Sequence, residues 1–237
     1  MADYFLVTCE HGGNRIPRPY LKYFSGREAL LQTHRGYDPG ALTTARELAR
    51  DLAAPLYYST ASRLLIDLNR SIGHPRLYSE ATRNAAERGE ILKRHYLPYR
   101  RRVESDIERA LDTGKRVIHI SSHSFTPQLD GKIRNADIGL LYDPARSEEA
   151  ALCKRWRAAL AATAPGLKVR RNYPYTGKSD GLTAHLRRHF APEDYLGIEL
   201  EINQRHVFAG GRSWAKLRAT VIAALDESVG RRARSAR

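Results

Sequence analysis

Short apolar runs, rich in β-branched and aromatic residues, alternate along the chain with segments in which apolar residues recur at helical spacing. The runs have the length of strands and lie at residues 4–9, 56–59, 64–67, 117–121, 138–142 and 195–202. The helical spacing occurs at residues 40–52, 90–111, 146–162, 182–190 and 213–229. Several runs are apolar throughout, as in strands that are buried on both faces. This order predicts an α/β fold with a mixed, mostly parallel central sheet and helices on both faces.

The chain has 237 residues, which is enough to bury one sizeable core, and no internal repeat or linker rich in Pro, Gly or Ser divides it. We therefore expect a single domain at residues 1–229 and a disordered basic tail at residues 230–237. No window approaches the roughly 18 apolar residues that a membrane span needs, and the first residues lack the features of a signal peptide. The sequence predicts a cytoplasmic protein that does not bind membranes.

The formal net charge is +14, a balance that permits binding of nucleic acid or attraction of anionic substrates. Most of the positive charge is arginine spread through the predicted helices, without an aromatic-rich platform or a recognisable reading helix. A solvated surface is the favoured interpretation, and nucleic acid is not the expected partner. Neither Cys9 nor Cys153 belongs to a Cys-x-x-Cys motif, so any metal must be held by histidine and carboxylate.

Polar groups stand at or just after four of the predicted strands, in residues 9–14, 67–70, 121–124 and 199–203. In an open α/β sheet, residues just past the carboxyl ends of strands converge on one crevice. Two histidines, several carboxylates and an Asn-Arg pair are thereby expected to meet in space. Longer loops at residues 71–84 and 172–181 are typical of segments that cover a site. Together these patterns predict one hydrolytic site built on a metal.

The metal ligands are expected among the residues that follow the first and middle strands. His11 stands before a glycine pair that permits a sharp turn or close approach to a ligand, and His123 ends another strand. Neutral imidazoles suit zinc, and a catalytic zinc needs three protein ligands and a water. We favour Asp38 as the third ligand, with Glu10 and Asn14 as rivals. An Asp before a proline is also a good helix N-cap, which is the alternative role for Asp38.

Two carboxylates, Glu199 and Glu201, lie two residues apart in the last predicted strand and therefore face the same side of the sheet. Burying both is costly unless a cation lies nearby, so a metal or an arginine is expected beside them. One carboxylate can act as general base on water and later as general acid to a leaving amine. The alternative is a structural ion pair with a buried arginine.

Asn69 and Arg70 end another predicted strand, and Arg63 precedes that strand. Arginine binds carboxylates through two parallel hydrogen bonds, and a neighbouring Asn amide adds donors. This pair is therefore a candidate for holding a substrate carboxylate. A second guanidinium group would stabilise an oxyanion.

Together these segments resemble the N-formylglutamate amidohydrolase family, zinc-dependent hydrolases related to the carboxypeptidase and aspartoacylase groups, over residues 7–203. The most specific parts are the His-Gly-Gly-Asn-x-Ile-Pro run at 11–17 and the Asp-Leu-Asn-Arg run at 67–70. The resemblance implies a three-layer α/β/α sandwich of the zinc-exopeptidase kind. It also implies that Asn69 and Arg70 hold the substrate carboxylate and that Arg63 faces the scissile carbonyl. The relatives' first zinc motif is His-x-x-Glu, whereas this chain has Asn14 at the last position.

We therefore predict a zinc-dependent amidohydrolase that removes a formyl or other small acyl group from an N-acylated acidic amino acid such as N-formylglutamate. Glu201, with Glu199 beside it, is expected to transfer protons, and Arg63 is expected to meet the oxyanion. Arg134, in a polar run at residues 132–137, is a candidate for holding a second carboxylate. The alternative function is a metal-free, basic nucleic-acid-binding protein on the same fold.

Overall fold

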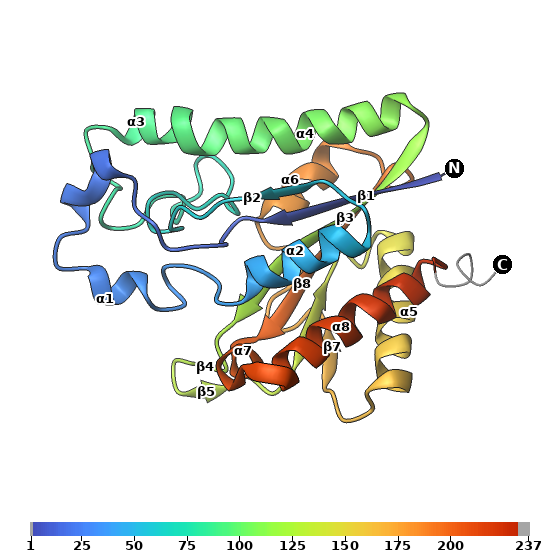
Figure 1. Cartoon of the computed structure of the whole chain (residues 1–237). Helices are drawn as coiled ribbons and strands as arrows, with labels where there is room; N and C mark the ends of the chain where they lie inside the picture. The colour runs from blue at the N-terminus through green and yellow to red at the C-terminus, as the bar shows by residue number, and fades with distance from the viewer. Residues whose placement is uncertain (1, 232–237) are drawn as a thin grey trace.

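The central sheet has six strands in the order β2-β1-β3-β8-β6-β7 (Figure 1). The strands are β1 (Ala2–Cys9), β2 (Leu56–Tyr58), β3 (Lys115–Phe125), β6 (Ile138–Leu141), β7 (Val169–Arg171) and β8 (Tyr195–Asn203). This computed structural model describes residues 2–231. The predicted tail at residues 230–237 lies outside the described residues, apart from its first two positions.

Four neighbouring strands of the sheet, β2, β1, β3 and β8, run parallel to one another. β6 is antiparallel to β8, and β7 is parallel to β6. The sheet is therefore mixed and mostly parallel, as predicted. The register between β3 and β8 places His123 opposite Glu201, which brings a histidine and a carboxylate from distant parts of the sequence together.

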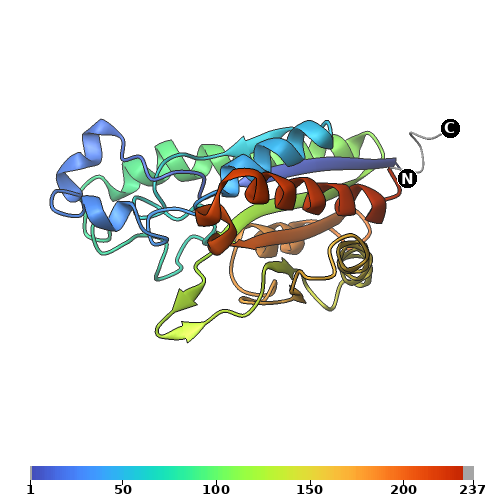
Figure 2. The same ribbon diagram turned by 60° about the horizontal axis from the view of Figure 1, so that its bottom comes forward.

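Helices cover both faces of the sheet and complete a three-layer sandwich (Figure 1, Figure 2). One face packs against α2 (Ala41–Asp51), α5 (Ser147–Thr163) and α8 (Gly211–Ser228). The opposite face packs against α4 (Leu97–Asp112) and α6 (Leu182–His189). The five predicted helices are all present, with ends displaced by a few residues, and the predicted α/β/α architecture is confirmed.

The long predicted helix at residues 90–111 contains an irregular turn. It begins as α3 (Arg88–Ile91), continues through a π-helical turn at Leu92–Tyr96 and becomes α4. Pro98 has no N–H to donate to the carbonyl four residues earlier. The N–H of the preceding residue, Leu97, bonds to the carbonyl of Leu92, five residues earlier, as in a π-helix. The proline therefore accounts for the wider turn at this point.

Residues 64–67 form no strand, so that prediction was wrong. They lie in a series of turns, in which the Leu65 N–H donates to the Ser62 carbonyl. Leu65 and Ile66 are nevertheless buried in the core on the α4 side of the sheet. The short apolar run correctly indicated burial, but a run of this length does not determine backbone conformation.

Several short elements were not predicted. They are β7, a two-stranded hairpin of β4 (Gln128–Leu129) and β5 (Lys132–Ile133), the 3₁₀ helix η1 (Arg18–Tyr23), α1 (Glu28–Leu31) and α7 (Gln204–Ala209). Each has six residues or fewer, too few to show a clear period. Within residues 2–231, no helix combines the length and apolar character needed to cross a membrane.

Candidate active site

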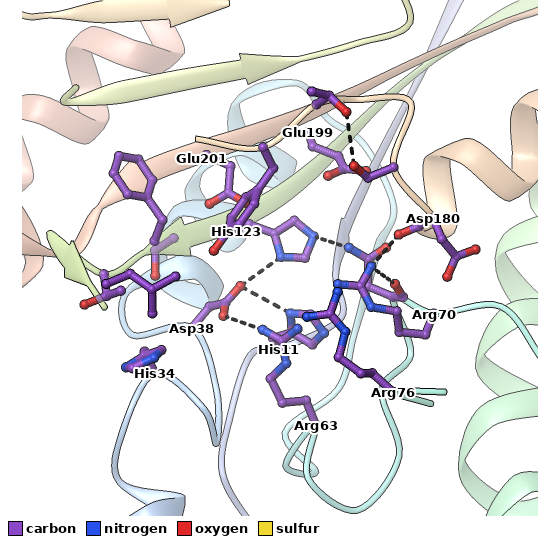
Figure 3. Close-up of a pocket in the computed structure, with 18 of the residues that line it drawn as sticks. His11, His34, Asp38, Arg63, Arg70, Arg76, His123, Asp180, Glu199 and Glu201 are labelled. Carbon is purple, nitrogen blue, oxygen red and sulfur yellow. Dashed lines mark hydrogen bonds and ion pairs between the residues drawn. The ribbon is translucent and has the colours of Figure 1, made fainter. Parts of the chain in front are cut away.

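The ends of β1, β3 and β8 adjoin one cavity of about 310 Å³ (Figure 3). Its lining is mainly histidine, carboxylate and arginine: His11, His34, Asp38, Arg63, Asn69, Arg70, His74, Arg76, His123, Asp180, Glu199 and Glu201. The parallel strands explain the convergence, because residues at their carboxyl ends share one edge of the sheet. All the predicted site residues except Arg134 line this cavity.

Asp38 joins the two predicted histidine ligands. Its Oδ2 atom lies 3.3 Å from His11 Nδ1 and 2.8 Å from His123 Nδ1. One potential ligand atom from each of the three buried residues lies within 4.8 Å of the others. The helix N-cap of α2 is Gly40, whose φ is +78°, and no side chain caps this end. The carboxylate of Asp38 is therefore directed to the histidines and does not cap the helix.

The second nitrogen of each imidazole is held by another buried carboxylate. His11 Nε2 lies 2.7 Å from Asp67 Oδ1, and His123 Nε2 lies 2.9 Å from Glu10 Oε2. Such outer carboxylates orient histidine ligands and leave the opposite ring nitrogen for a metal. Two imidazoles and one carboxylate are also a donor set that zinc accepts. The residues present therefore fit a metal ion.

The rival third ligands lie elsewhere. Glu10 stands behind His123, where its Oε1 atom accepts a hydrogen bond of 2.8 Å from the Tyr99 hydroxyl. Asn14 donates to Gln32, and it does not line the cavity. Among the candidates, the structure brings only Asp38 into contact with the Nδ1 atoms of both histidines.

The cluster carries ionised carboxylates despite its burial. Burial by itself raises the pKa of Asp38, but the charge and hydrogen bonds of His11 and His123 hold that pKa below its usual range. The hydrogen bond and charge of His123 overcome burial in the same way and lower the pKa of Glu10. Conversely, burial lowers the pKa of His123, but its bonds to Asp38 and Glu10 raise that pKa well above the usual value. The surroundings therefore favour positive charge at this point.

Arg63 connects the two carboxylates that flank His11. Its Nη1 lies 3.3 Å from Asp38 Oδ1, and its Nη2 donates to Asp67 Oδ2 at 2.9 Å. Burial of Asp67 opposes ionisation, but the charge of Arg63, followed by that of His11, keeps its pKa well below the usual range. The guanidinium group is thereby fixed beside the candidate metal ligands and still lines the cavity.

Glu199 and Glu201 occupy the same face of β8, as expected, but their surroundings differ. Glu199 Oε1 accepts a hydrogen bond of 2.5 Å from the Thr183 hydroxyl. Glu201 Oε2 is buried without a hydrogen-bond partner among the described residues. Burial is the largest influence on Glu201 and raises its pKa to about 8. This carboxyl group can therefore take up and release a proton near neutral pH.

Asn69 and Arg70 form one wall of the cavity. Asn69 Oδ1 accepts a hydrogen bond from the Leu182 N–H at 2.6 Å, which leaves its amide nitrogen 3.5 Å from His123 Nε2. Arg70 donates to the carbonyls of Asp180 and Asn69, while its Nε atom is buried without a partner among residues 2–231. Backbone groups thus orient both side chains, and the Nε–H group of Arg70 remains free to donate a hydrogen bond.

Arg134 is held at a greater remove from the reacting groups. Its guanidinium group lies 4.9 Å from the ring centroid of Tyr175 and donates to the Tyr175 hydroxyl at 3.0 Å. Tyr175 lines the cavity, whereas Arg134 does not. In this structure Arg134 adjoins the cavity through Tyr175 and through Phe125, whose ring centroid lies 6.0 Å from the guanidinium group.

The structure adds residues that the sequence analysis left without a role. Asp67 supports His11, and His34, His74 and Arg76 line the cavity. Asp67 begins the Asp-Leu-Asn-Arg run, so the motif itself offered a signal. His74 and Arg76 belong to the loop at residues 71–84 that was expected to cover a site. His34 had no sequence signal, because its position depends on how an irregular segment packs.

Known proteins resemble this chain in both sequence and fold. The sequence model of the N-formylglutamate amidohydrolase family matches residues 4–208. The crystal structure of a gene product from Agrobacterium tumefaciens is 30% identical, with a TM-score of 0.81, and the match covers 95% of this chain and 90% of that chain.

A second crystal structure, of N-formylglutamate amidohydrolase from Ralstonia eutropha, is 18% identical with a TM-score of 0.71, and the match covers 98% of this chain and 94% of that one. At that identity the second likeness shows the fold alone. Comparison with curated proteins finds no match. Because the family match spans most of the sequence, the chain belongs to the N-formylglutamate amidohydrolase family, whose members are hydrolases of amide bonds.

Proposed function

We propose that this protein is a zinc-dependent amidohydrolase that removes a formyl or other small acyl group from an N-acylated acidic amino acid such as N-formylglutamate. The observation that carries the proposal is the pairing of a His-Asp-His cluster with an unpartnered, buried carboxyl group in one cavity. The first offers ligands for a metal, and the second offers a proton acceptor. Amide hydrolysis needs both an electrophile and a proton carrier.

The metal would be held by His11, Asp38 and His123. When bound, zinc supplies a Lewis acid for the amide carbonyl and lowers the pKa of water. Asp67 and Glu10 keep the two imidazoles oriented through their Nε2 atoms.

Proton transfer falls to Glu201. Its carboxylate accepts a proton from the attacking water as the new C–O bond forms, and the protonated carboxyl group then gives that proton to the amine nitrogen as the C–N bond breaks. Glu199 is less available as the base, because Thr183 occupies one of its oxygens. Arg63 donates to the developing oxyanion from its position beside Asp38.

The substrate's anionic groups face the arginine-rich wall. Arg70 and Asn69 hold one carboxylate through guanidinium and amide donors. A second carboxylate approaches Tyr175, the residue through which Arg134 acts. The net charge of +14 attracts an anionic substrate as well. The family assignment gives no support to the alternative of a metal-free nucleic-acid-binding protein.

Metal content and hydrolysis test this proposal together. We expect about one zinc per chain by elemental analysis, and loss of N-formylglutamate hydrolysis after treatment with a chelator. The His123→Ala variant should lose the zinc, whereas His189→Ala, at an exposed histidine away from the cavity, should keep it. Protein that holds no metal and gains no activity from added zinc, cobalt or manganese would contradict the proposal.

A further inference from the structure

A second groove is lined by residues at the edge strand β2 and at the start of α4. It consists of two adjoining cavities of about 440 and 190 Å³. Both cavities are lined by the same central residues: Tyr58, Ser59, Ala61, His95, Tyr99 and Arg102. None of these residues lines the candidate active site, so the groove is a separate feature of the surface.

Positive charge gathers along this groove. Arg102 lines both cavities, Arg15 lines the larger and Arg94 the smaller. Arg94 pairs with Glu90, but neither Arg15 nor Arg102 forms an ion pair with any residue in the described range 2–231. No carboxylate is among the residues that line the two cavities. The groove therefore carries positive charge that no carboxylate in its lining neutralises.

Two of these arginines act on His95. His95 lies in the shared part of the groove, where burial, followed by the charges of Arg94 and Arg15, lowers its pKa. An anion placed among these groups would relieve their mutual repulsion. Binding of an anion nearby should raise the pKa of His95, because negative charge favours the protonated ring. The protonation of His95 therefore indicates whether an anion is bound.

Tyrosine residues also line the groove. Tyr58 lines both cavities and is 45% exposed, and the guanidinium group of Arg46 lies 5.5 Å from the centre of the Tyr58 ring. The Tyr99 ring lines the groove, while its hydroxyl donates to Glu10, which in turn bonds to His123. One aromatic residue thus borders both the groove and the outer shell of the proposed metal cluster.

We infer that this groove binds the phosphate group of a small molecule, with Arg15, Arg94 and Arg102 as the anion-binding residues. Phosphate carries about 1.5 to 2 negative charges at neutral pH and has at least three acceptor oxygens, so it can bind several guanidinium groups, whereas a single carboxylate carries one charge on two oxygens. Tyr58 is 45% exposed and lines both cavities, so its ring can pack against a planar group attached to the phosphate, beside the Arg46 guanidinium group. Free phosphate and a phosphate ester would both bind the arginines. Only an ester that carries a planar group would also contact the Tyr58 ring.

The experiment follows the side-chain NMR signal of His95 in the full chain while sodium phosphate is added. The His95 signal is identified by its loss in His95→Gln. Because the active-site cavity also contains arginines, the signal of His95, and not total binding, locates the ligand. We expect a saturable shift and a raised pKa of His95, neither of which sodium chloride at equal ionic strength produces.

Two neighbouring arginines of α4 provide the matched variants. Arg102→Ala should weaken phosphate binding at His95 at least about tenfold, as expected for loss of a charge-assisted hydrogen bond. Arg101→Ala removes the same charge one residue away, at a side chain that lines neither cavity, and should change the affinity by less than about twofold. Circular dichroism checks that both variants are folded.

A further titration with adenosine monophosphate separates the two sources of phosphate. Tighter binding than inorganic phosphate, lost in Tyr58→Ala, supports a phosphate ester, whereas equal affinity supports free phosphate. The inference is overturned if neither compound shifts His95 more than chloride does, or if Arg101→Ala and Arg102→Ala weaken binding equally.

Discussion

The two faces of β8 differ sharply in composition. The even-numbered residues from 196 to 202 are all apolar and buried, and they pack into the core beneath α2, α5 and α8. The odd-numbered positions of the same strand include Glu199 and Glu201, which line the cavity on the opposite face. One strand therefore contributes to stability with one face and to chemistry with the other.

The polar face extends across the neighbouring strands. In β3, His119 lies between the Thr8 hydroxyl at 2.8 Å and the Tyr195 hydroxyl at 2.7 Å, and burial lowers its pKa to about 4. Nearby, the Ser121 hydroxyl donates to Glu10. Buried polar groups are tolerated when each finds a partner. The free oxygen of Glu201 is therefore an exception on this otherwise hydrogen-bonded face.

The largest expected effect is on the polar face. Glu201→Gln should lower turnover of N-formylglutamate by about 10²–10⁴, because it removes the proposed proton carrier. It should leave metal content unchanged, since Glu201 is not one of the three proposed ligands. The measurements are kcat and elemental analysis, with Glu199→Gln for comparison. Unchanged turnover in Glu201→Gln, together with a loss in Glu199→Gln, would assign the proton transfer to the other carboxylate.

Glu201→Gln should also change how the free energy of unfolding depends on pH. In chelator-treated protein, the pKa of Glu201 is raised from 4.5 to about 8, so the folded state binds this proton more tightly than the unfolded state. The resulting stability is present below pH 4.5 and is lost as pH rises through about 8. Glu201→Gln should remove this loss, which denaturant unfolding at pH 5 to 9 would detect as a flatter profile. A wild-type profile as flat as that of the variant would contradict the buried, unpartnered state of the carboxyl group.

The opposite face should respond in stability and not in chemistry. Ile198→Ala removes a fully buried side chain from the apolar face and should destabilise the fold by about 2–5 kcal/mol. The folded variant should keep kcat within about twofold of the native value, because the site lies across the sheet. Urea unfolding and kinetics below the unfolding transition measure the two quantities. A folded Ile198→Ala protein with a large loss of kcat would show that the two faces are not independent.

A smaller effect is expected at the wall of the cavity. Arg70→Lys keeps the charge but loses the planar fork, so binding of N-formylglutamate should weaken by about ten- to a hundredfold. An analogue that lacks the corresponding carboxylate should bind the native protein and the variant almost equally. If the variant discriminates between the two compounds as strongly as the native protein does, then Arg70 has a structural role.

The smallest effect is expected at Arg134, which adjoins the cavity through Tyr175 and Phe125. Arg134→Ala should raise KM by only about two- to fivefold, as expected for loss of weak cation–π contacts with Tyr175 and Phe125, and leave kcat unchanged. Tyr175→Phe keeps the ring but removes the hydroxyl that accepts from Arg134, and it provides the control. A loss in Arg134→Ala as large as that in Arg70→Lys would show direct contact with substrate.

The sequence alone determined the architecture and the positions of the chemical groups along it. The alternation of apolar runs and helical periods predicted the mixed sheet and its two helical layers, because burial imposes these patterns directly. The placement of His11, His123 and Glu201 at strand ends indicated a shared site, because parallel strands end at one edge. Local patterns of this kind are readable from the chain.

Only the tertiary structure decided which groups touch. It directed Asp38 to both histidines, placed Glu10 behind His123 and left one oxygen of Glu201 without a partner. It also turned residues 64–67 away from the sheet, so that a strand-like run became a buried series of turns. These outcomes depend on contacts between segments far apart in the chain, and the free energies of such contacts override local preference.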